Sequence, residues 1–296
     1  MWFKNLQIYR ITSGCMMGAV LEEALARHVL QNCLQLEMQS RGWVMPRDEG
    51  ANFVHVFGQH MLFALGVEKK LLPATVINQF AKERIVDIEH QQGYKPGRKQ
   101  IKEIKEAVMI ELLPRAFVQR RKTCAWIDST GEWLIIDTAN TAKAEELLEV
   151  LYKSVDRLTL APLKTQTSPS SAMTGWLSGD DLSAAFSIDR DCELRGIEDE
   201  QATVSYTHHV LDSAETSRHI KAGKKVTKLA LTWRNKVSFV LHDNLQLKRI
   251  APLDILKEPA ETTEELFDSD FVIMTGELTQ LIPDLIDALG GEENTH

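Results

Sequence analysis

Two periodic patterns of apolar residues alternate along the 296-residue chain, and this alternation constrains the fold more than any other feature. Segments with period two are typical of strands, and segments with period 3.6 are typical of helices. A strand pair followed by a helix occurs twice, and a third strand pair follows later with different residues and irregular spacing. The pattern therefore predicts an α+β fold with antiparallel sheets built from hairpin–helix units, and no sequence repeat.

The elements that these patterns predict cover most of the chain. Strands are expected at residues 2–11, 53–57, 61–65, 123–127, 133–137, 226–233, 237–242 and 245–250. Helices are expected at residues 17–38, from Pro73, after the loop 91–98, from Thr141 as N-cap, and at the C terminus, where Pro283 should kink the helix or mark a restart.

The loop 91–98 contains two glycines and a proline, which turn one predicted helix into the next. Both flanking helices have narrow apolar stripes. Residues 73–113 are therefore predicted to form an αα-hairpin that projects from a sheet. A Ser/Thr/Pro-rich segment at 165–171 is the best candidate for a linker near the middle of the chain.

Opposite charges are segregated along the chain, although its formal net charge is −8. Residues 218–249 hold nine basic residues and one acidic residue, and residues 82–122 hold eleven basic and six acidic residues. Residues 254–293 hold twelve acidic residues and one lysine. We expect one positive and one negative surface from this sorting. For residues 82–122, ordinary solvated helix faces explain the charges equally well.

Several classes of protein are not supported by the sequence. No run of 18 or more apolar residues is present, and the first residues lack a secretory signal, so we expect a cytoplasmic protein without membrane spans. Four scattered cysteines favour buried free thiols over a disulfide or zinc framework.

Motifs of catalysis are also missing. The segment around Gly223-Lys224 lacks the first glycine of a phosphate loop, because position 218 is an arginine, and no dinucleotide, nucleophile-elbow or metalloprotease motif occurs. The adjacent His208 and His209 would point to opposite faces of a strand. We therefore predict no catalytic residue, metal or cofactor, although a site assembled from distant residues stays open.

Phe117 stands among charged residues just after a proline that ends a predicted helix. An apolar side chain at such a boundary either plugs its own domain or contacts a partner subunit, and the pattern favours neither.

Six segments together carry a more specific signal. They are Met1-Trp2-Phe3-Lys4-Asn5-Leu6 with Tyr9-Arg10, Gly42-Trp43-Val44 with Pro46, Leu112-Leu113-Pro114-Arg115-Ala116-Phe117, the run 219–231, the run 274–278, and Leu289-Gly290-Gly291-Glu292. In this order, from residue 1 to about 293, the chain resembles the bacterial recombination-associated RdgC family.

The resemblance implies a non-enzymatic DNA-binding protein that forms a ring-shaped homodimer around double-stranded DNA and restrains RecA-driven strand exchange by indirect competition. It implies nucleoid association and three regions: a central domain (residues 1–72 and 114–164), a tip hairpin (73–113) and a base domain (165–296). Phe117 would belong to the tip-side dimer interface or gate. Two departures are Pro283 in the C-terminal helix and His208-His209, where relatives carry a basic residue.

Charge and resemblance together predict that a positive channel contacts DNA phosphates without sequence preference, with the acidic remainder facing outward. The predicted DNA-binding residues are Arg98, Lys99, Lys221, Lys224, Lys225, Lys228, Arg234 and Lys236. Single-stranded DNA is a further candidate partner. The alternatives are a nucleic-acid-processing enzyme and a protein–protein adaptor.

Overall fold

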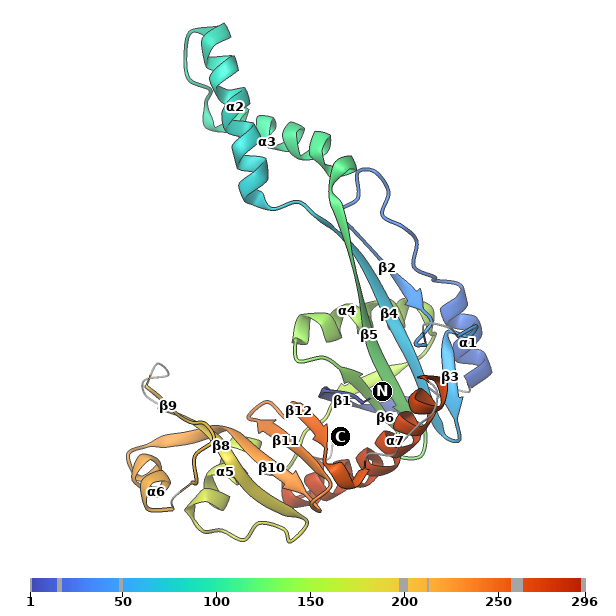
Figure 1. The fold of residues 1–296 in the computed structure, drawn as a ribbon, viewed down its shortest axis with the longest axis vertical. Helices are drawn as coiled ribbons and strands as arrows, with labels where there is room; N and C mark the ends of the chain where they lie inside the picture. The colour runs from blue at the N-terminus through green and yellow to red at the C-terminus, as the bar shows by residue number, and fades with distance from the viewer. Residues whose placement is uncertain are drawn as a thin grey trace. The chain divides into compact units, whose positions relative to one another are not determined.

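The computed structural model describes residues 2–14, 18–47, 50–196, 202–211, 213–256 and 263–293 (Figure 1). The strands are β1 Asn5–Ser13, β2 Gln39–Val44, β3 Val54–Phe57, β4 His60–Leu71, β5 Phe117–Asp128, β6 Trp133–Asp137, β7 Thr159–Pro162, β8 Phe186–Gly196, β9 Thr203–Tyr206, β10 Lys224–Trp233, β11 Val237–His242 and β12 Leu247–Pro252. The helices are α1 Gly18–Ala26, α2 Ala74–Gln92, α3 Arg98–Leu112, α4 Thr141–Ser154, α5 Pro169–Ser178, α6 Ser213–Lys221 and α7 Thr263–Ala288, with short 3-10 turns at Leu113–Arg115 and Asp254–Leu256.

The α+β class and the antiparallel pairing of the strands are confirmed. The chain divides into two compact units. Unit 1 comprises Met1–Gly18, His55–Leu62 and Cys124–His296, and unit 2 comprises Ala19–Val54 and Phe63–Thr123. Strands β4 and β5 run from one unit into the other. This division differs from the three predicted regions, since residues 124–164 and 165–296 fall in the same unit.

The sheet of unit 1 has the strand order β6-β1-β12-β11-β10-β8-β9, with β7 paired to β1. Leu229, Leu231 and Trp233 of β10 are fully buried. Helix α7 lies against this apolar side, where the indole Nε1 of Trp233 donates to Asp284 Oδ2 at 2.7 Å. Lys228 and Ala230 alternate with these residues and line open grooves on the other side of the sheet.

The hairpin β10–β11 is tight because two adjacent residues adopt left-handed backbone conformations. Arg234 has φ 45° and Asn235 has φ 53°, as in a type I′ turn. The two pairs nearest the turn are Thr232 with Ser238 and Trp233 with Val237. The predicted turn at Arg234-Asn235 is thus confirmed.

Unit 2 contains the antiparallel pair β2–β4 and the helices α2 and α3. Ala81, Ile104 and Val108 form a small buried cluster between the two helices. The apolar stripes predicted for residues 73–113 therefore face each other. Helix α2 ends at Gly93, whose φ of 78° is the left-handed conformation that glycine adopts easily.

The helix predicted at residues 17–38 was too long. Helix α1 ends at Ala26, and the following segment is bound to β2. His28 accepts a hydrogen bond from the Trp43 amide at 2.8 Å, and the Leu30 amide donates to Trp43 at 3.1 Å. The apolar spacing continues near-helically after Ala26, but residues 28–30 bond to β2 through the isolated bridge of Val29 with Trp43 instead of continuing the helix.

Residues 165–171, which the sequence predicts as a linker, are hydrogen-bonded to another part of the chain. The Gln166 amide donates to Gly291 and the Thr167 amide donates to Leu289, so this segment is tied to the C-terminal end of the chain. The Ser168 hydroxyl then caps α5 by accepting from the Ser171 amide.

One helix cap was misplaced, and one of the two alternatives at Pro283 is excluded. Asn140, and not Thr141, caps α4 through its side chain. Helix α7 continues through Pro283 from Thr263 to Ala288, so a restart at the proline is excluded. None of the helices among the described residues is long and apolar enough to cross a bilayer.

Candidate nucleic-acid interface

Four cations lie close together where α6 leads into β10. We call Arg218, Lys221, Lys224 and Lys225 the basic strip. The turn between the two elements is short because Gly223 adopts φ 85°, which a glycine reaches without strain. The end of a helix and the start of a strand thereby present their cations in direct succession.

Helix α6 is fixed to the rest of unit 1 by its other face. Thr216 is buried, and the rings of Tyr206 and His219 lie 6.4 Å apart. Arg218 and Lys221 on α6 are exposed, and so is Lys225 at the start of β10.

The basic strip is free of carboxylates within the described part of the chain. Lys224 is half-buried and donates to the Ala202 carbonyl at 3.4 Å, which leaves its charge uncompensated. No ion pair joins the other three cations to any acidic residue that the structure describes. Among the described residues, the strip therefore has no ion pair that would compete with a phosphate.

Helix stability explains only part of this arrangement. Cations in the last turn of α6 interact favourably with the carbonyl end of the helix, which accounts for Arg218 and Lys221. Lys225 lies beyond the helix and is the direct cross-strand partner of Arg195 on β8. Like charges in opposite positions destabilise a sheet, so Lys225 is not explained by folding.

Three other predicted DNA-binding cations are held by carboxylates, and we call them the clamped cations. Lys228 Nζ lies 2.6 Å from Glu193 Oε2, and Lys236 Nζ lies 2.7 Å from Glu277 Oε1. An Arg234 guanidinium nitrogen lies 2.8 Å from Asp284 Oδ2. A phosphate that approached these three would have to compete with an existing ion pair.

The clamped cations have clear structural roles. Arg234 and Lys236 join the β10–β11 turn to α7, and Lys228 joins β10 to β8. Although burial alone would raise the pKa of the Glu193 carboxyl, hydrogen bonds from Lys228 and Thr227 lower it overall. A lowered carboxyl pKa means that this pair stabilises the fold above about pH 4.5 and loses that contribution as the pH falls.

The open side of the sheet also carries His242, on β11 beside these cations. Its pKa is lowered to about 4, first by burial and then by the charges of Lys248 and Lys228. The hydrogen bond from the His208 amide lowers the pKa of Asp191. Burial alone would raise this pKa, but the His208 bond and the contact with Arg249 together outweigh it. This face thus combines cations with carboxylates, unlike the basic strip.

In unit 2, Arg98 and Lys99 are exposed in the first turn of α3. Gly97, the N-cap, offers no side-chain acceptor, and the first turn holds no acidic residue. The N-terminal end of a helix carries a partial positive charge, which cations oppose. Five cations and one acidic residue lie between Gly93 and Lys105, so this helix end is positive at a cost in stability.

Phe117, at the start of β5, is 84% exposed, while its neighbour Val118 is 47% exposed. The side chain therefore does not plug its own unit among the described residues. Of the two interpretations that the sequence left open, the structure leaves an apolar contact available to a partner.

Two features were missed by the sequence interpretation. Arg218 belongs to the basic strip, and its spacing of three residues from Lys221 on a helix was a usable signal. Arg249 contacts Asp191 at 2.9 Å, a pairing that no local pattern indicates.

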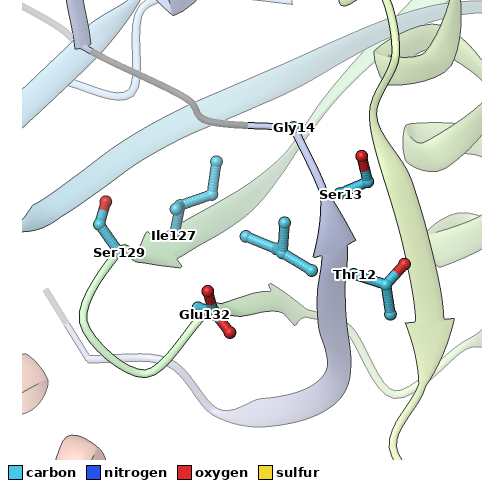
Figure 2. Close-up of a pocket in the computed structure, with 7 residues that line it drawn as sticks. Thr12, Ser13, Gly14, Ile127, Ser129 and Glu132 are labelled. Atoms are coloured by element: carbon cyan, nitrogen blue, oxygen red, sulfur yellow. The ribbon is translucent and has the colours of Figure 1, made fainter. Parts of the chain in front are cut away.

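A separate pocket of about 270 Å³ lies beside β1 and the β5–β6 turn in unit 1 (Figure 2). Thr12, Ser13, Ser129 and Glu132 line it together with isoleucine side chains. None of the eight predicted DNA-binding residues lies among the described residues that line it. Among the residues that the structure describes, no three His, Cys, Asp or Glu side chains group closely enough to hold a metal ion.

Known proteins resemble this chain over its full length. A family model described as "Putative exonuclease, RdgC" matches residues 1–292. Recombination-associated proteins RdgC from Herminiimonas arsenicoxydans and Bordetella pertussis are each 50% identical, and each alignment covers 99% of both chains. The protein of the same name from Cupriavidus pinatubonensis is 51% identical with the same coverage. The two descriptions differ on enzymatic activity, but they agree on the family. The chain therefore belongs to the RdgC family of recombination-associated proteins.

Proposed function

We propose that this protein binds double-stranded DNA through its phosphates, without sequence preference, as a ring-shaped homodimer that encircles the duplex. In this proposal it occupies DNA that a RecA filament needs and so restrains strand exchange in the nucleoid, without touching RecA. The central, tip and base regions predicted from the resemblance remain part of this proposal.

One observation carries the proposal: five predicted cations are free of carboxylates in the described residues. Arg98, Lys99, Lys221, Lys224 and Lys225 have no acidic partner, whereas Lys228, Arg234 and Lys236 do. Uncompensated surface cations that do not stabilise the fold are expected where a polyanion binds. Recombination acts on DNA, so the names of the relatives agree with such a partner.

The homodimer is supported by Phe117. A phenylalanine that is 84% exposed suits the buried centre of a subunit interface. In a closed ring, release from DNA requires opening such an interface as well as breaking phosphate contacts.

The direct experiment is binding of a random-sequence duplex over a salt series, beside the mass of the protein in solution. Five free cations per chain give a dimer about ten phosphate contacts at most, and affinity should then fall roughly 10³- to 10⁵-fold between 50 and 200 mM salt. A nearly flat salt dependence or a monomeric mass would contradict the proposal. Failure to retard any DNA would favour the adaptor alternative.

A second candidate function comes from the family description, which names an exonuclease. Incubating end-labelled duplex and single strands with the protein and Mg²⁺ tests it. We expect intact DNA. Loss of the label that requires Mg²⁺ and grows with protein concentration would support the enzyme instead.

The ring predicts a specific effect of Phe117→Ala. Because a weakened interface opens more often, the variant should leave covalently closed circular DNA faster, while its residence on short linear duplex changes little. Competition with excess unlabelled DNA measures both rates. Leu36→Ala is a matched control, since Leu36 is also exposed. Equal acceleration on circular and linear DNA would argue against a gate.

A further inference from the structure

Unit 1 contains a cleft of about 450 Å³ on the side of α4, away from the basic strip in sequence. Residues of β1, α4, β7 and the β11–β12 turn line it. This volume lies in the range of pockets that hold small organic ligands. No residue proposed to contact DNA belongs to its lining.

The described lining residues of the cleft carry negative charge only. Glu145 on α4 is the charged residue that lines it, and no lysine, arginine or histidine lies among the described lining residues. Glu145 is exposed and has no hydrogen bond or ion pair within the described part of the chain. The cleft therefore disfavours phosphates and carboxylates and favours a cation.

Two tyrosines line the same cleft. Tyr152 on α4 is 45% exposed, and Tyr9 on β1 is half-buried with its hydroxyl 3.5 Å from Gln7 Oε1. Burial first, and then the charges of Glu145 and Tyr152, raise the pKa of Tyr9. Aromatic faces beside a carboxylate attract organic cations.

The remaining lining supplies apolar walls and hydrogen-bond acceptors. Leu148 on α4 and Leu160 on β7 provide aliphatic surface. The amide nitrogen of Gln246 donates to Thr141 Oγ1 at 3.1 Å, which leaves its Oε1 as an acceptor. An ammonium group is a pure donor, and its alkyl chain suits the leucine walls.

From this arrangement we propose that the cleft binds an alkylammonium group, with the ammonium held by Glu145 and the rings of Tyr9 and Tyr152 and the chain lying against Leu148 and Leu160. The site does not depend on the proposed DNA binding. Its chemistry fits both a free aliphatic amine and a lysine side chain.

Calorimetric titration of the protein with hexylammonium tests this proposal, beside hexanoate as a probe of matched length. Hexylammonium should bind saturably in the millimolar range or tighter, and hexanoate should not. Absence of saturable binding, or equal binding of hexanoate, would overturn the proposal.

Two variants locate the binding. Glu145→Gln should weaken hexylammonium about tenfold, because it removes a charge-assisted hydrogen bond. Glu149→Gln removes the same charge from the same helix outside the cleft and should have little effect. If Glu145→Gln and Glu149→Gln weakened hexylammonium binding equally, the effect would come from net charge in general, and the proposed site would be contradicted.

Tyr152→Phe keeps the aromatic face and should bind hexylammonium like the wild type, whereas Tyr152→Ala should bind it about threefold more weakly.

The two sources of an alkylammonium are separated by competition. Cadaverine represents a free amine, and Nα-acetyl-lysine methylamide represents a side chain in a protein. Displacement of hexylammonium by either one supports the site and names its source. If neither displaces it at concentrations where hexylammonium saturates, the assignment to an alkylammonium group fails.

Discussion

The basic strip and the clamped cations come from one basic run of sequence in unit 1, yet their surroundings differ. Among the described residues, Lys221 and Lys225 face solvent without a carboxylate partner, whereas Lys228 and Lys236 are each held at 2.6 to 2.7 Å by a glutamate that is itself mostly buried. The first group adds little to the fold, and the second group holds strands and α7 together. The number of cations in a segment therefore overstates the charge that is available to a polyanion.

The largest effect on DNA binding should follow from removing the lysine charges of the basic strip. Replacing Lys221, Lys224 and Lys225 by glutamine should lower the slope of log affinity against log salt by about 3 per chain, since each lysine that neutralises a phosphate contributes about one counterion. Fluorescence anisotropy of a labelled random duplex measures the slope. Lys143→Gln on α4, an exposed lysine outside the strip, should leave the slope unchanged.

A smaller effect is expected at the N-terminal end of α3. Replacing Arg98 and Lys99 by glutamine should lower the slope of log affinity against log salt by about 2 per chain. The same change should stabilise the protein by about 0.3 to 1 kcal/mol per charge, because the helix end repels cations. Urea unfolding beside the anisotropy series checks both signs. Lost stability together with unchanged DNA binding would show that these cations serve the fold.

The smallest effect sharpens the comparison by converting a clamped cation into a free one. Glu193→Gln releases both Lys228 and Arg195, which pair with the same carboxylate. The salt slope should therefore rise by about 1 or less per released cation, while the free energy of unfolding falls by about 1 to 3 kcal/mol. Glu149→Gln removes the same charge from an exposed pair on α4 and serves as the control. If DNA affinity fell in Glu193→Gln, the ion pair itself would have to take part in binding.

Local patterns predicted much of the fold. The alternation in β10 and β11 and the turn at Arg234-Asn235 depend on neighbouring residues, and they were confirmed. The facing stripes of α2 and α3 were predicted for the same reason. The end of α1 was missed because residues 28–30 bond to Trp43 of β2, a contact made across a dozen or more residues.

The carboxylate partners of the clamped cations could not be predicted from the sequence. Lys228 and its partner Glu193 are 35 residues apart, and Lys236 and Glu277 are 41 residues apart. Which acidic side chain meets which lysine depends on sheet register and on the position of α7, and charge counting contains neither. The exposure of Phe117 likewise became visible only once its own unit was shown to leave it uncovered.

The most direct test sets the two groups against each other with equal changes of charge. The double variants Lys221→Gln/Lys225→Gln and Lys228→Gln/Lys236→Gln each remove two lysines from unit 1, and urea unfolding confirms that both are folded at the assay temperature. The salt dependence of duplex binding should lose about 2 units of slope per chain in the first variant and less than about 1 in the second. Equal losses, or a larger loss in the second variant, would contradict the claim that unclamped cations carry the binding of DNA.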